Sequence, residues 1–341
     1  MKVLTFGELM LRLSSPGHSR LFQRDRLETL FCGSEANVAV SLAQFGISSK
    51  YITKLPSNDI GLAAARSLAY YGVDTSDVLY GDGRMGIYYL ESGASQRSSK
   101  VIYDRAFSAV SLADPSEYDW ERLFTGVDWF HTSGITPAIS NNAAAATLTA
   151  VKAANKLGIT VSCDLNYRAK LWTPEQAQRV MGELMPYVDI CIANEEDAGK
   201  MLNITAEGSD FERGFVSAES YKTVARQISD CYGCSYVGVT LRESFSASHN
   251  GWSGLLYRAD TCDVTQSRKY DISIVDRVGA GDSFTAGLIW ALLNGDSSSQ
   301  AVEFATAASC LKHSIEGDFN RASVAEVQAL VAGDSSGRVR R

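Results

Sequence analysis

Short apolar runs alternate with longer segments of helical apolar spacing along most of the chain. The first pair is KVLTFG, which is rich in strand formers, and EANVAVSLAQFG, whose apolar positions recur every three or four residues before a closing glycine. Later predicted strands are KYITKL, DWFHTSG, ITVSCDL, DICIAN and SYVGVTL, and later predicted helices are IGLAAARSLAYYG, NNAAAATLTAVKAANKLG, TPEQAQRVMGELM and FTAGLIWALL. This order predicts an α/β fold: a doubly wound, mostly parallel sheet flanked by helices, with ligands at the carboxyl ends of its strands.

Two stretches interrupt this alternation. Residues 8–33 and about 84–105 contain strand formers and turn residues without a helical segment, which predicts a small antiparallel sheet beside the main domain. Such a sheet exposes an apolar face, so we expect it to cover a ligand as a lid, to pair with a second subunit, or both. Residues 1–333 are therefore expected to form one domain with these lid segments, and residues 334–341 a flexible tail.

Composition narrows the class of protein. The formal net charge of −7, with basic residues clustered only in the terminal RVRR, argues against a nucleic-acid partner. The chain has no run of about eighteen apolar residues and no signal-peptide pattern, so we expect a cytoplasmic protein without a membrane partner. Seven scattered cysteines are expected to be reduced thiols, and the isolated pair Cys231 and Cys234 favours a helix end over a zinc or redox site.

The segment DRVGAGDSF, residues 276–284, is the main candidate for chemistry. Gly279, Ala280 and Gly281 have little or no side chain, so their backbone N–H groups can bind an anion at the N-terminus of the predicted helix. An ordinary N-capped helix is the alternative for this segment alone. The G-x-G lacks the remaining features of a dinucleotide fingerprint, and no G-x-x-x-x-G-K-[ST] occurs, which argues against a nicotinamide oxidoreductase and a P-loop NTPase.

The chain resembles the ribokinase-like (PfkB) carbohydrate kinase family over nearly its whole length. GSEANVAVSLAQFG resembles the family's first signature and DRVGAGDSFTAGL its second. The resemblance implies that the backbone of residues 279–281 binds the transferring phosphoryl group and that Asp282 accepts the proton of the sugar hydroxyl. It also implies ATP and Mg²⁺ as cofactors, and a monovalent cation such as K⁺ near Asp276. Phosphoryl transfer needs this combination of preorganised positive potential and a nearby base.

Three further segments resemble the family's nucleotide and metal site. IANEEDAGKML resembles an Asn-x-x-Glu segment, which implies Asn194 for the phosphates and Asp197 or Glu195 for Mg²⁺, although an acidic first helical turn explains the same charges without metal. VTLRESFSASHNGWSGLLY and ATAASCLKH fall where the family contacts ATP. The implied contacts are Thr240, Arg242, which stands where the family has glycine, and Ser309, for which a buried helix face is the alternative.

The first signature carries the predicted sugar contacts. Gly33, Ser34 and Asn37 match the family's Gly-Gly-x-x-x-Asn region, in which a glycine lets the ligand approach the backbone and the asparagine can bond vicinal hydroxyls. Cys32 replaces the first glycine of this region. The conformation of the turn before Ser34 is therefore open at this point.

Two arginines indicate which sugar is bound. Tyr103 and Arg105 alternate onto one face of a predicted lid strand, while Arg168 follows the strand that ends at Asp164. A guanidinium group suits a carboxylate better than it suits a neutral hexose, although either arginine can instead pair with a local aspartate or contact an ATP phosphate. The segments resemble those of 2-keto-3-deoxygluconate kinases, in which a lid tyrosine and arginine hold the sugar acid, and Tyr88 is expected to join them.

These features together predict an ATP-dependent kinase that phosphorylates the primary hydroxyl of a sugar acid, 2-keto-3-deoxygluconate, to the 6-phosphate. A fructokinase or another ribokinase relative is the nearest alternative. A non-catalytic sugar sensor is the alternative from another class, and the intact GAGD and Asn194 speak against it. Pairing through the lid predicts a homodimer or a higher oligomer.

Overall fold

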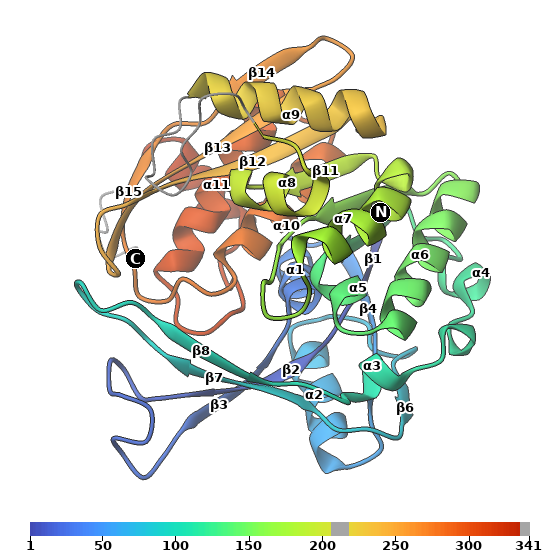
Figure 1. The fold of residues 1–341 in the computed structure, drawn as a ribbon. Coiled ribbons are helices and arrows are strands. Elements are labelled where there is room, and N and C mark those ends of the chain that lie inside the picture. The colour runs from blue at the N-terminus through green and yellow to red at the C-terminus, as the bar shows by residue number, and fades with distance from the viewer. Residues whose placement is uncertain (206–217, 335–341) are drawn as a thin grey trace.

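The computed structural model describes residues 1–205 and 218–334, and the predicted tail lies almost wholly outside these ranges. Within the described residues, nine strands form the main sheet (Figure 1). Its parallel part runs, in spatial order, through β4 (Ser48–Ile52), β1 (Lys2–Phe6), β9 (Trp129–Ser133), β10 (Thr160–Asp164), β11 (Ile190–Ala193) and β12 (Tyr236–Ser244). The antiparallel part is β13 (His249–Arg258), β14 (Asp263–Gln266) and β15 (Tyr270–Ser273). The predicted mostly parallel sheet is confirmed.

Helices cover both faces of this sheet, because successive residues of each strand are buried on opposite sides. Val3 packs into one apolar cluster and Leu4 into another. The layer with Val3 contains α1 (Ser34–Gln44), α10 (Ala280–Leu293), α11 (Ser298–His313) and α12 (Val324–Val331). The layer with Leu4 contains α6 (Asn141–Lys156), α7 (Pro174–Leu184), α8 (Glu195–Leu202) and α9 (Ala218–Tyr232). The sheet and its two helical layers thus form the doubly wound architecture that the alternation predicted.

The remaining elements are short or lie at the edges of the main sheet. They are β5 (Lys54–Pro56), β6 (Leu79–Gly81), α2 (Asp59–Tyr70), α3 (Ala109–Leu112), α4 (Trp120–Leu123), α5 (Ile135–Ala138), and the 3₁₀ turns Pro115–Glu117 and Met185–Tyr187. All seven cysteines are free thiols. Among the described residues, no helix has the length and apolar character to cross a bilayer.

A separate four-stranded sheet, called the small sheet below, is built from the two segments that interrupt the alternation. Its order is β3 (Glu28–Cys32), β2 (Met10–Ser14), β7 (Gly86–Glu91) and β8 (Lys100–Asp104). The expectation of an antiparallel sheet is wrong for one pair, because β2 and β7 run parallel. The chain returns to the main sheet through β4 and α2 between these strands, and such a crossover permits parallel pairing.

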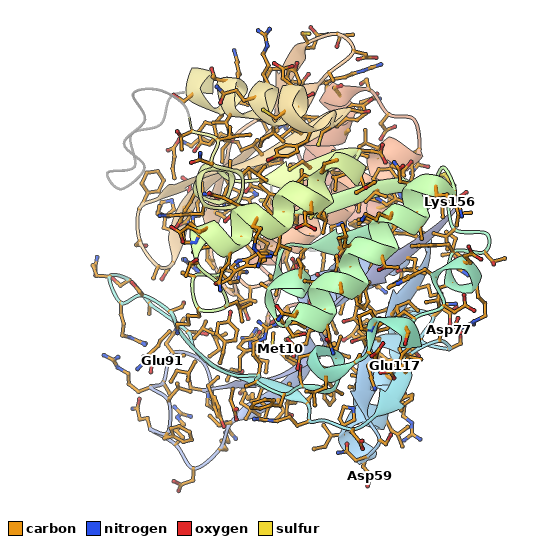
Figure 2. The ribbon with its side chains drawn as sticks, turned by 45° about the vertical axis from the view of Figure 1, so that its right-hand side comes forward. Met10, Asp59, Asp77, Glu91, Glu117 and Lys156 are labelled. Carbon is orange, nitrogen blue, oxygen red and sulfur yellow. The ribbon has the colours of Figure 1, made fainter. Side chains whose placement is uncertain are left out.

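One face of the small sheet is turned toward the main domain. Met10, Cys32 and Tyr88 are buried there and form an apolar cluster with Val278 of the main domain. Figure 2 shows Met10 near the middle of the molecule, where the small sheet meets the main domain, and Glu91 farther out along the sheet. The small sheet therefore forms a wall over the carboxyl ends of the parallel strands.

Candidate active site

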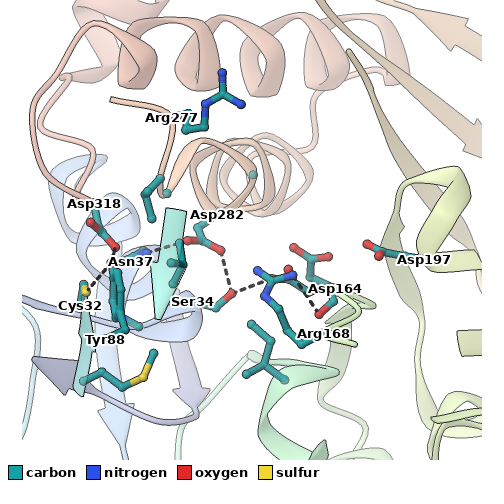
Figure 3. Close-up of a pocket in the computed structure, with 18 of the residues that line it drawn as sticks. Cys32, Ser34, Asn37, Tyr88, Asp164, Arg168, Asp197, Arg277, Asp282 and Asp318 are labelled. Atoms are coloured by element: carbon teal, nitrogen blue, oxygen red, sulfur yellow. Dashed lines mark hydrogen bonds between the residues drawn. The ribbon is translucent and has the colours of Figure 1, made fainter. Parts of the chain in front are cut away.

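A cavity of about 280 Å³ lies between the small sheet and the carboxyl ends of β10, β11 and β12 (Figure 3). Most residues predicted from the sequence as site residues line it, although they come from segments far apart in the chain. They are Gly33, Ser34, Asn37, Tyr88, Tyr103, Arg105, Arg168, Asn194, Asp197, Thr240, Gly279, Gly281 and Asp282. The fold thus brings the predicted phosphoryl, sugar and metal residues into one cavity.

The glycine turn, residues 276–281, places the N-terminus of α10 at this cavity. Gly279 is the N-cap and has φ +83°, a left-handed conformation that glycine adopts without steric cost. A Cβ atom at this position would lie 2.0 Å from the main-chain oxygen of Asp318, so the turn also needs a residue without a side chain. No side chain of the described residues caps α10. The Ala280 amide donates to the main-chain oxygen of Arg277 at 3.4 Å, and the Gly281 and Asp282 amides stay available to an anion.

Asp282 is held in the first turn of α10 by two donors from α1. Ser34 Oγ donates to its Oδ1 at 2.7 Å and Asn37 Nδ2 donates to its Oδ2 at 2.6 Å (Figure 3). Burial, together with the smaller effect of the charges of Glu35 and Asp318, raises the pKa of Asp282 to about 6, although the two hydrogen bonds oppose the rise. Asp282 is therefore mainly ionised at neutral pH and can accept a proton.

The start of α1 is shaped by a close approach of two main chains. A Cβ atom at Gly33 would lie 2.1 Å from the main-chain oxygen of Glu8, so this position needs glycine even though Cys32 replaces its neighbour in the signature. Ser34 also accepts a hydrogen bond from Asn166 Nδ2 at 3.1 Å. Asn166 lines the cavity and was not predicted as a site residue, although it lies in the segment DLNYRAKLW.

The small sheet contributes a polar network to the opposite wall. The Cys32 thiol donates to Tyr88 Oη at 3.3 Å, and Tyr88 Oη donates to Asp318 Oδ2 at 2.8 Å (Figure 3). Arg105 lies beside the Tyr103 ring, with Cζ 5.5 Å from the ring centroid. The partner of Arg105 is not a local aspartate: its Nε and Nη2 both donate to Glu8 Oε2, 97 residues away along the chain, and Arg105 still lines the cavity.

Arg168 lies among carboxylates at the main-sheet side. Its Nη1 donates to the main-chain oxygens of Asn166 and Tyr167 at 3.3 and 2.9 Å, and no side-chain acid of the described residues accepts a hydrogen bond from it. Asp164 lies between Asp282 and Asp197 in Figure 3. Burial raises the pKa of Asp164 well above its usual range, and the charges of Asp197 and Asp282 add to the rise.

Asp197 and Asn194 form a donor set that suits a hard cation. Asn194 caps α8 by accepting from the Asp197 amide at 2.8 Å, and its Nδ2 donates to Asp197 Oδ2 at 2.8 Å. Burial raises the pKa of Asp197 to about 7. No group of three metal-ligating side chains occurs in the described part of the chain, which fits Mg²⁺ better than a metal caged by protein alone, because Mg²⁺ takes one or two carboxylates and completes its shell with waters and phosphates.

Three predicted residues do not line the cavity. Ser309 is fully buried and donates to the main-chain oxygen of Ala280 at 2.7 Å, so it supports the glycine turn from behind instead of lining the cavity. Ala280 is itself buried, and Arg242 is exposed; neither lines the cavity. The side chain of Glu195 lies outside the described ones.

Arg277 is a cavity residue that the sequence prediction missed. Its Nη2 donates to the main-chain oxygen of Ala247 at 2.8 Å, while burial and the charge of Arg242 lower its pKa. A cation two residues before Gly279 was the signal available in the sequence. Arg277 therefore lines the cavity two residues before the N-cap of α10.

Known proteins resemble this chain over its whole length. The model of the pfkB family carbohydrate kinases matches residues 1–224 and 255–320. The 2-dehydro-3-deoxygalactonokinase of Haloferax volcanii is 31% identical over 98% of both chains, and the 2-dehydro-3-deoxygluconokinase of Bacillus subtilis is 28% identical over 94% of this chain and 92% of its own. The crystal structure of 2-dehydro-3-deoxygluconokinase from Thermotoga maritima superposes with a TM-score of 0.94 at 50% identity, covering 98% of this chain and 100% of that one. With its signatures joined in one cavity, the chain belongs to the pfkB family of carbohydrate kinases.

Proposed function

We propose that this protein uses ATP to phosphorylate the primary hydroxyl of 2-keto-3-deoxygluconate, also named 2-dehydro-3-deoxygluconate, giving the 6-phosphate. The observation that carries the proposal is one cavity lined both by Asp282 with the glycine turn and by Arg105 and Arg168. Asp282 and the glycine turn together provide the groups for phosphoryl transfer to a hydroxyl. The two arginines provide cations for the carboxylate at the far end of a sugar acid. The names of the relatives from B. subtilis and T. maritima support the same substrate.

The acceptor hydroxyl is proposed to lie at Asp282. This carboxylate is oriented by Ser34 and Asn37, and it takes the hydroxyl proton as the oxygen attacks phosphorus. The backbone of Gly279 and Gly281 then faces the charge of the transferring group. The reaction requires a general base and an anion site lined by amides, and one turn of helix provides both.

The nucleotide and its metal are proposed to lie at the main-sheet side of the cavity. Asn194 and Asp197 would hold Mg²⁺, which neutralises phosphate charge when bound, and Thr240 and Arg277 line the adjoining wall. Ser309 contributes through its hydrogen bond to Ala280. The monovalent cation expected beside Asp276 is not part of this proposal, because Lys312 Nζ donates to the main-chain oxygen of that residue.

We propose that residues of the small sheet bind the carboxylate of the sugar acid. Arg105 donates hydrogen bonds from Nε and Nη2 to Glu8. Its third nitrogen, Nη1, has no hydrogen-bond partner among the described residues. Tyr88 and Tyr103 line the same cavity, and their ring centroids are 6.0 Å apart. Two further predictions from the sequence stay predictions. They are a cytoplasmic location and assembly through the small sheet.

A coupled assay of ATP consumption tests the proposal on the wild type and Arg105→Ala together. The compounds are 2-keto-3-deoxygluconate, its C4 epimer 2-keto-3-deoxygalactonate, fructose, ribose and tagatose. We expect the wild type to prefer a sugar acid, and Arg105→Ala to lose about 10–100-fold in kcat/KM for it, as for the loss of one charge-assisted hydrogen bond from Nη1.

Each other outcome has a distinct meaning. Preference for the C4 epimer would keep the sugar-acid proposal and change the sugar, as the Haloferax relative suggests. Preference for fructose with unchanged kinetics in Arg105→Ala would replace the proposal with a fructokinase. Failure to consume ATP with every compound would favour a sugar sensor.

The pH profile of kcat/KM tests Asp282 as the base. Its pKa in the folded protein is about 6, and only the ionised carboxylate can accept the proton. We therefore expect kcat/KM to be level above the pKa and to fall about tenfold per pH unit below it, measured at saturating magnesium and ATP. A profile that rises as the pH drops below 6 would contradict the assignment.

A further inference from the structure

Lys312 is a fully buried lysine behind the glycine turn, and the proposed reaction gives it no role. It lies in the last turn of α11, and its Nζ donates to the main-chain oxygens of Asp276 at 3.3 Å and Ile315 at 3.1 Å. Both acceptors are carbonyl groups: Asp276 precedes α10 and Ile315 follows α11. A buried ammonium group is costly unless its donors and charge are satisfied, so this placement needs a compensating environment.

Two carboxylates and one further cation provide that environment. Arg12 of the small sheet pairs with Asp276 at 2.8 Å and with Asp318 at 2.5 Å, and all three side chains are buried. The carboxylates of Asp276 and Asp318 also attract Lys312, while burial is the larger effect and lowers the pKa of Lys312. The cluster therefore contains two cations and two carboxylates and is close to neutral.

This cluster does not fit the K⁺ ion that the family resemblance implies beside Asp276. K⁺ is held in proteins by several carbonyl oxygens that replace its water shell. Here the carbonyl of Asp276 already accepts from Lys312, and its Oδ2 accepts from Arg12 and from the Gly317 amide at 3.2 Å. A third cation would face both Arg12 and Lys312 without a free carboxylate to compensate it.

We infer that the Lys312 ammonium group takes the place of a monovalent cation and positions the glycine turn, so that the enzyme needs no K⁺. This inference rests on the proposed function of the cavity. The contacts explain how the positioning works: Lys312 joins Asp276 to Ile315, and Asp276 Oδ1 accepts from the Val278 amide at 3.1 Å. The same 315–318 segment supplies the Asp318 carbonyl against which Gly279 packs.

The first test measures the wild-type enzyme in potassium-free and sodium-free buffer and again with about 0.1 M KCl, at constant ionic strength set with tetramethylammonium chloride. We expect kcat/KM to differ by less than about twofold. An increase of tenfold or more on adding K⁺, on the order of 1.4 kcal/mol, would overturn the inference. Absence of kinase activity under both conditions would refute the proposed function instead.

The second test uses Lys312→Ala, which removes the ammonium group beside the two carbonyls together with three methylene groups and leaves room for a monovalent cation. We expect turnover to fall about 10²-fold, because the turn that carries the amides is no longer held, and to recover at least in part with ammonium or potassium ions. Lys269→Ala is the matched control, since Lys269 is half exposed and pairs with Glu243 on the surface. Its turnover should stay at the wild-type value with and without these salts.

Two readouts do not depend on turnover. Ammonium and potassium ions are expected to raise the melting temperature of Lys312→Ala and to leave that of the wild type unchanged against the tetramethylammonium reference. If the variant does not fold, crystals of the wild type in rubidium chloride decide the question through anomalous scattering. Rubidium bound at the Asp276 carbonyl of the wild type would overturn the inference, and no bound rubidium there would support it.

Discussion

Asp282→Asn is expected to lower turnover by about 10²–10⁴-fold while leaving affinity for the sugar acid within a few-fold of the wild type. The amide is almost isosteric with the carboxylate, and it can accept from Asn37 through its oxygen and donate to Ser34 through its nitrogen. What it loses is the ability to accept a proton at the attacking hydroxyl. Turnover is measured with ATP at saturation, and binding of the sugar acid by calorimetry.

The melting temperature of Asp282→Asn is the control that separates a loss of turnover from a loss of folding. The pKa of Asp282 is raised in the folded protein from the usual 3.8 to about 6, so the ionised side chain costs stability, and this cost develops as the pH rises through that window. A neutral amide removes the cost, and the melting temperature at neutral pH should be equal or higher than that of the wild type. Near-normal turnover in a folded variant would remove Asp282 from its role as base.

The alternation of apolar runs was enough to predict the doubly wound fold, because β9, β10 and β11 are short, apolar and each followed by a helix. Thr173 and Ser297, for example, cap α7 and α11 with complete capping boxes. The parallel pairing of β2 with β7 was not predictable in this way. About seventy residues separate the two strands, and their pairing depends on where β4 and α2 return the chain.

Within the site, prediction succeeded where a motif and its local geometry coincide. The glycine turn and the N-terminus of α1 each carry their function in a few consecutive residues, and both line the cavity. Arg12, Asp318 and Arg277 were missed because their roles exist only after distant segments meet. Arg12 on β2 pairs with Asp276 and Asp318, which lie more than 260 residues away along the chain. No local sequence pattern predicts such a contact.

Ser309 illustrates the converse error. Its place on a late helix near the nucleotide segments suggested direct contact, yet helical position does not reveal which side of the turn a residue faces. The structure turns Ser309 toward the main-chain oxygen of Ala280. Its hydroxyl and the Lys312 ammonium group both support the glycine turn from the side away from the cavity.

Because the glycine turn is supported in this way, Gly279→Ala is expected to cause the second large loss of turnover, beside that of Asp282→Asn. The methyl group would lie 2.0 Å from the Asp318 carbonyl, and the residue would keep φ near +83° only at a further cost. Left-handed strain of about 1–2 kcal/mol and overpacking of about 1–3 kcal/mol both oppose the native turn. Because a shift of about 1 Å at the reacting groups costs about 10²-fold, we expect turnover to fall at least that far.

Two further glycines, one within α10 and one just after it, separate the causes of this loss. Gly295 follows the other end of the helix with φ +74° and nothing within 4 Å of its built Cβ, so Gly295→Ala measures the backbone strain without a clash and should keep full turnover. Gly281 has neither a positive φ nor a contact within 4 Å, so Gly281→Ala should keep the wild-type melting temperature. If Gly279→Ala melts no lower than Gly295→Ala and turns over normally, the Asp318 carbonyl yields without moving the amides, and the glycine turn is not the rigid anion site on which phosphoryl transfer here depends.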